Sequence, residues 1–329
     1  MQASRRQLAL GALALACGLG AAPAFAQATY PAKPISIVVS YPPGGDTDAI
    51  ARMFAEKLSQ RLHQSVIVDN RPGAGGTIGN GYVGRATPDG YTLLFTPNPF
   101  TTAPMVMGLA PAASYDVLNG FEPVIKTATQ PLLLVANPNV GVKTVPELVA
   151  AANAGKTISY ASPGAGSPMH FVGEWLNRSA GVKFSHVPYR GVGPSVTDVV
   201  AGHVNTAWVT IGAVSQYVGT QRLVPLAIGD ARRSKLAPNV PTLVEQGYKD
   251  VVVGAWNGFF APKGTPKDIV TLLNTHLNAI LKEPEVIEKL ATYGAEPAGG
   301  APDVLQRTNA DEYAQMGKLM KELGISASN

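Results

Sequence analysis

Four glycine-rich turns carry the residues of this sequence that are best suited to chemistry. They span residues 42–47, 72–77, 162–167 and 189–193. Each turn can aim unpaired backbone N–H groups at a bound molecule, and a helix that starts there adds the positive end of its dipole. Hydroxyl groups lie beside these turns, in Thr47, Thr77, Ser162, Ser167 and Thr210. Such donors, without a full counter-charge, suit a carboxylate that must later be released.

The first turn follows the apolar run Ile35–Val39 and precedes a helix expected at about residues 47–62. A strand covered on both faces has this composition, and the prolines and glycines end it. Asp46 and Asp48 stand where they could cap the helix and balance its dipole, and contact with a ligand is the alternative reading. Because residues 35–50 contain no Lys or Arg, an anion here would be held by the backbone.

Two larger side chains are further candidates. His170 follows Ser167 in the first turn of an expected helix, where it could donate to an anion or serve only the structure. Trp208 ends an expected strand and lies either at a cleft or in the core. Tyr189 is also a candidate, because the fourth glycine-rich turn begins with this residue.

The motifs of several enzyme classes are absent from the sequence. It contains no G-x-S-x-G, and Gly155-Lys156-Thr157 lacks the earlier glycine of a phosphate-binding loop. The segment 73–76 lacks dinucleotide spacing, and the five histidines lack metal-ligand spacing. We therefore expect a binding protein without cofactor or metal, and an exported hydrolase is the alternative from another class.

Residues 1–26 have the features of a cleaved signal peptide. Arg5 and Arg6 precede an apolar run, and Ala24-Phe25-Ala26 is a small-x-small cleavage site. The stretch 4–8 also resembles a twin-arginine signal, so we expect export to the periplasm by the Sec or the twin-arginine route. The sole cysteine, Cys17, lies within this segment, which leaves the mature chain without thiol chemistry.

The mature chain is close to neutral. The formal charge is +4 for the whole chain, and Arg5 and Arg6 account for two of these charges, which leaves +2. The basic residues are scattered, so we expect no nucleic-acid partner. A monomer is the expected state.

Strands and helices alternate in two blocks, which predicts parallel sheets with right-handed crossovers. Ligands of such sheets bind beyond the carboxyl ends of the strands, where the glycine-rich turns lie. We expect the first lobe at 27–126 plus 252–329 and the second at 127–251. The three helices near the C-terminus should complete the first lobe, and a short helix is expected at about 240–247.

The chain is similar to the TctC/Bug family of periplasmic solute receptors, the extracytoplasmic components of tripartite tricarboxylate transporters. The resemblance covers nearly the whole mature chain and lies in ordered motifs. These are Tyr30-Pro31-x-Lys33-Pro34-Ile35, Pro42-Pro43-Gly44-Gly45-x-Thr47-Asp48, Asn70-Arg71-Pro72-Gly73-Ala74-Gly75-Gly76, Pro88-Asp89-Gly90-Tyr91-Thr92-Leu93-Leu94, Gly164-x-Gly166-Ser167-Pro168-x-His170, His186-Val187-Pro188-Tyr189-Arg190-Gly191, Val240-Pro241-Thr242 and Phe260-Ala261-Pro262-x-Gly264-Thr265-Pro266.

The resemblance implies an α/β, two-lobed Venus-flytrap fold of the class II periplasmic binding type, with the ligand cleft between the lobes. It implies that loops 41–48 and 162–170 hold a ligand carboxylate, partly through water. The partner would be a two-component membrane permease or, alternatively, a sensor kinase. The predicted ligand contacts are Tyr41, Pro43, Gly44, Gly45, Asp46, Thr47, Asp48, Gly76, Ser162, Gly164, Ala165, Gly166, Ser167, His170, Tyr189, Trp208 and Thr210.

Two positions depart from the family pattern. Asp46 replaces a residue that is commonly small or hydroxylated, and at the cleft it would repel an anion or welcome a ligand amine. Trp208 is bulky where smaller residues are frequent. It predicts an apolar pocket floor suited to an aromatic or medium-chain carboxylate.

Overall fold

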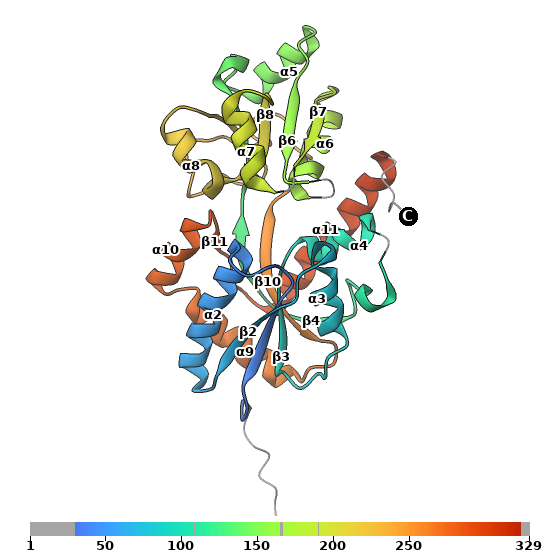
Figure 1. Ribbon diagram of the computed structural model, residues 1–329, viewed down its shortest axis with the longest axis vertical. Coiled ribbons are helices and arrows are strands. Elements are labelled where there is room, and N and C mark those ends of the chain that lie inside the picture. The colour runs from blue at the N-terminus through green and yellow to red at the C-terminus, as the bar shows by residue number, and fades with distance from the viewer. Residues whose placement is uncertain (1–29, 108, 165–166, 190, 324–329) are drawn as a thin grey trace, which may run out of the picture. The chain divides into compact units, whose positions relative to one another are not determined.

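The computed structural model describes residues 30–107, 109–164, 167–189 and 191–323. The chain divides into two units, residues 1–32 and residues 33–329. Of the first unit only residues 30–32 are described, and the Tyr30–Pro31 peptide bond is cis. The predicted signal peptide lies outside the described residues. The second unit contains two sheets flanked by helices (Figure 1).

The first sheet has six strands in the order β11-β4-β10-β3-β1-β2. The strands are β1 (Ile35–Val39), β2 (Val66–Asn70), β3 (Thr92–Pro97), β4 (Phe121–Gln130), β10 (Ala255–Pro262) and β11 (Glu296–Pro297). β1 pairs in parallel with both β2 and β3, as predicted. The prediction of wholly parallel sheets is wrong, because both sheets also contain antiparallel pairs. β10 is antiparallel to β3 and β4, and β11 is antiparallel to β4.

Helices cover both faces of this sheet. They are α2 (Asp46–Leu62), η1 (Ala74–Gly76), α3 (Thr77–Gly84), α4 (Pro99–Val106), η2 (Pro111–Ala113), α9 (Lys267–Ile280), α10 (Pro284–Thr292) and α11 (Pro302–Leu323). Because side chains alternate along a strand, Phe259 packs against Phe54 of α2 on one face. Its neighbour Phe260 stacks on Phe100 of α4 on the other. The sheet therefore has a core on each side.

The second sheet has five strands in the order β7-β6-β8-β5-β9. The strands are β5 (Leu132–Ala136), β6 (Ser159–Ser162), β7 (Ser185–Pro188), β8 (Thr206–Thr210) and β9 (Val224–Ile228). β6 is parallel to β7 and β8, whereas β5 is antiparallel to β8 and β9. The accompanying helices are η3 (Pro138–Val140), α5 (Val145–Asn153), α6 (Pro168–Ala180), α7 (Val192–Ala201) and α8 (Ile211–Gly219).

The chain passes between the sheets at two places. β4 remains paired in the first sheet to Gln130, and β5 begins in the second at Leu132. The return lies between β9 and β10, where the Val253 N–H still bonds to the Gly229 carbonyl at 2.8 Å. The exact lobe boundaries stay a prediction.

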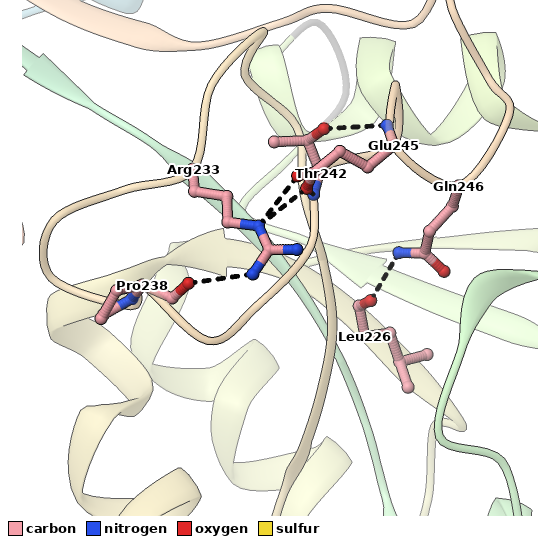
Figure 2. A network of polar contacts seen from close by, with 6 residues as sticks. All are labelled: Leu226, Arg233, Pro238, Thr242, Glu245 and Gln246. Carbon is pink, nitrogen blue, oxygen red and sulfur yellow. Dashed lines mark hydrogen bonds and ion pairs between the residues drawn. The ribbon is translucent and has the colours of Figure 1, made fainter.

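The long connection from β9 to β10 is held by a polar network (Figure 2). The Arg233 guanidinium donates to both carboxylate oxygens of Glu245, at 2.9 and 3.0 Å, and to the Pro238 carbonyl. Thr242 and Glu245 bond to each other's backbone N–H groups, and Gln246 donates to Leu226 of β9. The prediction of a helix at 240–247 is wrong. These residues form a turn, because Thr242 also makes a bridge to Ile228.

The last helix reaches beyond the first lobe. Met316, Leu319 and Met320 of α11 are buried in the same apolar cluster as Leu134 and Trp208 of the second sheet. α11 thus packs against both lobes, whereas the sequence placed it wholly in the first. Among the described residues, no helix is long and apolar enough to span a bilayer.

Candidate functional site

Two of the glycine-rich turns meet at the carboxyl ends of β1 and β2. The Tyr41 hydroxyl donates to the Gly75 carbonyl at 3.1 Å, and Asn70 donates to the Tyr41 carbonyl. Gly76 has a φ of +95°, and a Cβ there would lie 3.2 Å from the Tyr41 ring. The close approach requires glycine at this position. The contact of Tyr41 with Gly75 and Gly76 therefore fixes the conformation of the first loop.

Asp48 stabilises this loop through hydrogen bonds to its carboxylate. It is only 3% exposed, and it accepts hydrogen bonds from the Gly44 N–H (2.9 Å), Asn70 (2.9 Å) and Arg52 (3.0 Å). Burial alone would raise the pKa of Asp48, but these three donors together lower it. With its oxygens occupied, Asp48 is a structural residue, and it also takes the Gly44 N–H that the sequence assigned to the ligand. At both positions these internal bonds compete with the ligand contact predicted from the sequence.

Asp46 has no such structural role. It is the first residue of α2, whose N-cap is Gly45, and no side chain caps this helix end. Within the described residues, its carboxylate makes no hydrogen bond or ion pair. Its side chain is exposed to a pocket, and partial burial raises its pKa. Pro43 and Thr47 flank it, exposed and half-buried respectively.

The two turns of the second lobe are also joined. The Tyr189 N–H bonds to the Ser162 carbonyl (2.9 Å) and the Gly191 N–H to the Pro163 carbonyl (3.0 Å). Ser167 caps α6 by accepting the His170 N–H, and its hydroxyl donates to the Gly164 carbonyl at 2.7 Å. Predicted contacts Ala165 and Gly166 lie outside the described residues.

Ser162, His170 and His186 form a contact group behind these turns that the sequence did not predict. A 2.6 Å hydrogen bond joins Ser162 Oγ to His186 Nε2, and the His186 ring stacks on His170 with 4.1 Å between centroids. Burial, followed by the neighbouring His170, lowers the pKa of His186 to about 4. Because Ser162 is fully buried, it is not placed to attack a substrate, and the pair instead fixes the turn. No local sequence signal predicts this contact, because it depends on the pairing of β6 with β7, in which His186 lies opposite Tyr160.

Two further predictions meet different outcomes. Trp208 is 1% exposed and packs in the core with Leu134, its partner across β5 and β8. The expected aromatic pocket floor is therefore wrong, because the strand alternation turns Trp208 into the protein. The Tyr189 hydroxyl donates to Asp198 at 2.6 Å, which ties it to α7.

One pocket of about 560 Å³ brings segments of both lobes together. Of the predicted contacts, Asp46 and Thr210 line it. Its full lining is Asp46, Val192, Gly193, Val196, Thr197, Thr210, Gly212, Ala213, Tyr217, Thr292 and Tyr293. This volume suits a small organic ligand. Within the described residues, no group of three or more His, Cys, Asp or Glu side chains is placed to hold a metal ion.

Besides the Asp46 carboxylate, two helix ends contribute to the electrostatics of this pocket. α7 begins at Val192 after Gly191, and α8 begins at Ile211 after Thr210. Neither helix has a side-chain cap or an acidic residue in its first turn. Their first N–H groups lack intrahelical partners, and both helix dipoles present their positive ends. The arrangement can hold an anion without Lys or Arg.

A second pocket, of about 250 Å³, lies where the chain crosses between the lobes. Lys126, Asp230 and Glu312 line it. The Glu312 carboxylate accepts hydrogen bonds from Asn98 (2.8 Å) and from the Trp256 indole (2.6 Å). Burial raises the pKa of Glu312 to about 7, and burial likewise lowers the pKa of Lys126. Glu312 thus ties α11 to the crossover segment.

Comparison with known proteins places this geometry in context. Residues 50–325 match the model of the tripartite tricarboxylate transporter family receptor. Protein BugT of Bordetella pertussis is 36% identical over 327 residues, which is 98% of this chain and 99% of the relative. A TctC solute binding protein from Polaromonas is 31% identical with a TM-score of 0.80, covering 89% of this chain and all of the other. An R. palustris protein solved with adipate is 32% identical with a TM-score of 0.75, covering 91% and 100%.

Proposed function

Because the chain belongs to the tripartite tricarboxylate transporter receptor family, we propose that it is an exported receptor for a small organic acid. In this proposal the ligand is captured in the pocket shared by the two lobes and is delivered in the periplasm to a tripartite tricarboxylate-type permease. The observation that carries it is the meeting of the uncapped N-termini of α7 and α8 at one pocket that also includes Asp46.

A carboxylate at these helix ends receives backbone hydrogen bonds where the helix dipoles favour negative charge. Hydrogen bonds to a charged acceptor are stronger than neutral ones, so a few N–H groups suffice to orient it. No guanidinium or ammonium group is among the described side chains that line the pocket. Release of the carboxylate then breaks no ion pair with a Lys or Arg side chain, which suits a receptor that must hand its ligand on.

The glycine-rich turns at 41–48 and 162–167 are proposed to complete the site. Asp48 takes the Gly44 N–H, and the Gly164 and Ser167 N–H groups bond within their own turn. The donors proposed on the first-lobe side are therefore the N–H groups in the first turn of α2, which lack intrahelical partners. The apolar part of the pocket comes from Val192, Val196 and Ala213 in place of Trp208. Adipate, present in one solved relative, is the first medium-chain acid to test.

The test is calorimetric titration of the mature chain, from Gln27 onward, with adipate, succinate, citrate, glutamate, aspartate and benzoate. Binding of at least one acid, lost for its methyl ester, supports carboxylate capture. No binding of any acid contradicts the proposal. Turnover of a bound acid, followed by NMR, would support the hydrolase alternative instead. Dependence of bacterial uptake on the receptor gene would separate transport from sensing through a kinase.

A charge placed at the helix ends gives a sharper version of this test. Gly193 lies in the first turn of α7, and a Cβ there would meet nothing within 4 Å. Gly193→Glu should therefore fold normally and weaken the binding of an acid by about 1–3 kcal/mol through loss of charge-assisted bonds. Gly219→Glu, also in open space but outside the pocket lining, is the matched control. Equal affinity of both variants would refute the assignment.

A further inference from the structure

We propose that the physiological ligand carries a cationic nitrogen in addition to its carboxylate, and that Asp46 receives this nitrogen. The inference rests on the proposed function, since it assigns the second polar group of a ligand whose carboxylate lies at α7 and α8. The ligand class is a small amino acid or another amino-carboxylate.

The first support is the charge of the pocket lining. Among the described residues that line it, Asp46 is the one with a formal charge. The others are apolar residues, glycines and hydroxyl side chains, of which Thr197 and Thr292 already donate to backbone carbonyls, those of Gly193 and Lys289. Asp46 is exposed to this open pocket and partly desolvated there, so a cation in the pocket has a negatively charged partner available and an anion is repelled.

The second support is that the protein offers Asp46 no partner of its own. The neighbouring cation, Arg52, is engaged by Asp48 and Asn70. Asp48, not Asp46, bonds to the loop that precedes α2. The negative charge of Asp46 offsets the positive end of the α2 dipole. Because that positive end is offset, the first-lobe side of the pocket is less suitable for an anion. The Asp46 carboxylate is therefore available to a ligand.

The third support is a separation of charge between the lobes. Thr292 and Tyr293, at the C-terminal end of α10, line the same pocket as Asp46. The negative end of the α10 dipole lies here, although the carbonyls of Lys289, Leu290 and Ala291 accept hydrogen bonds from the residues that follow them. Lys289, in the last turn of α10, lines a different pocket with Lys57 and Glu285, and its ammonium nitrogen lies 5.9 Å from the Tyr293 ring centroid, so it offsets part of this negative end. The first lobe thus contributes a negative side, and the second contributes the positive ends of α7 and α8.

An amino-carboxylate matches this polarity in one orientation. Its carboxylate lies at α7 and α8 in the second lobe, and its ammonium group lies at Asp46 in the first. Each end of the ligand then binds a different lobe, so the complete set of contacts forms only when both lobes hold it. A diacid without nitrogen would bring a second negative charge toward Asp46.

The experiment compares matched acids that differ in one amino group, namely glutamate with glutarate, aspartate with succinate and 4-aminobutyrate with butyrate. Dissociation constants are measured by calorimetry on the mature chain, on Asp46→Asn and on Asp46→Ser. Asp268→Asn is the control, because Asp268 is an exposed acid in the first turn of α9, outside the pocket. Circular dichroism and thermal melting establish that each variant is folded.

We expect at least one amino acid to bind the unmodified chain at least tenfold more tightly than its nitrogen-free partner. Both Asp46 variants should weaken that amino acid by about tenfold to hundredfold and should leave or strengthen binding of the partner acid. Binding of nitrogen-free acids with no preference for the amino group, or equal losses for both members of a pair, overturns the inference while the proposed function stands. Failure of every acid to bind overturns the proposed function and this inference with it.

Discussion

Glu312 should make the folded chain lose stability as the pH rises toward neutrality. Burial raises the pKa of this carboxyl from its ordinary 4.5 to about 7, in spite of the bonds from Asn98 and Trp256. The folded chain therefore holds the proton more tightly than the unfolded chain does. The stabilisation is fully present below about pH 4.5 and is lost as the pH rises to about 7. The difference between the two pKa values corresponds to about 3 kcal/mol.

The variant Glu312→Gln isolates this contribution, because an amide of nearly the same shape does not ionise. The free energy of unfolding is measured by urea denaturation of the mature chain at several pH values between about 5 and 8. The stability of the unmodified chain relative to the variant should fall by about 3 kcal/mol across this range. Asp311→Asn, at the adjacent exposed position of α11, controls for the general charge of the helix. A difference between the unmodified chain and Glu312→Gln that stays constant with pH would refute the reasoning.

Three further predictions concern packing and buried polar groups. Gly173→Ala would place a Cβ 2.3 Å from the Tyr160 ring and should destabilise the chain by about 1–3 kcal/mol; Gly317→Ala, which meets nothing within 4 Å, should not, and urea denaturation compares the two. Asp48→Ala should cost about 1–3 kcal/mol because it removes the buried acceptor of the Gly44, Asn70 and Arg52 hydrogen bonds; since the pKa of Asp48 is lowered in the folded chain, this contribution should be present above about pH 3.8 and be lost below it, and a variant within 0.5 kcal/mol of the unmodified chain at pH 7 would contradict it. His186 should titrate near pH 4 by NMR, so its contribution to stability is present above about pH 6.5 and lost as the pH falls toward 4; an observed pKa above 6 would mean that the ring is open to water.

The family, the α/β class and the alternation of strands with helices were predictable, and all are confirmed. They depend on signals that are local in the chain. The apolar run 35–39 gives β1, and Pro284 and Pro302 mark the first residues of α10 and α11. The fixed φ of proline suits the first turn of a helix wherever the helix later packs.

The side-chain roles were less predictable, because they depend on partners distant in sequence. Trp208 fits a cleft or a core equally well until the pairing of β8 with β5 decides which way it points. Ser162 and His186 become neighbours only when β6 and β7 pair. Likewise, the buried end of α11 requires both lobes to be in place. Periodicity shows that a face is apolar, but not which element covers it.

Asp46 and Asp48 show how two like residues in one helical turn acquire different roles. Both could cap α2 or balance its dipole, and the sequence alone does not separate them. Arg52, one turn after Asp48, and Asn70, at the end of β2, both bond to Asp48, so its charge is neutralised within the first lobe. Asp46 lies on the side of the helix that lines the pocket, beyond these donors. The loop is therefore fixed by one carboxylate, and the other is left to determine which charge a ligand must carry.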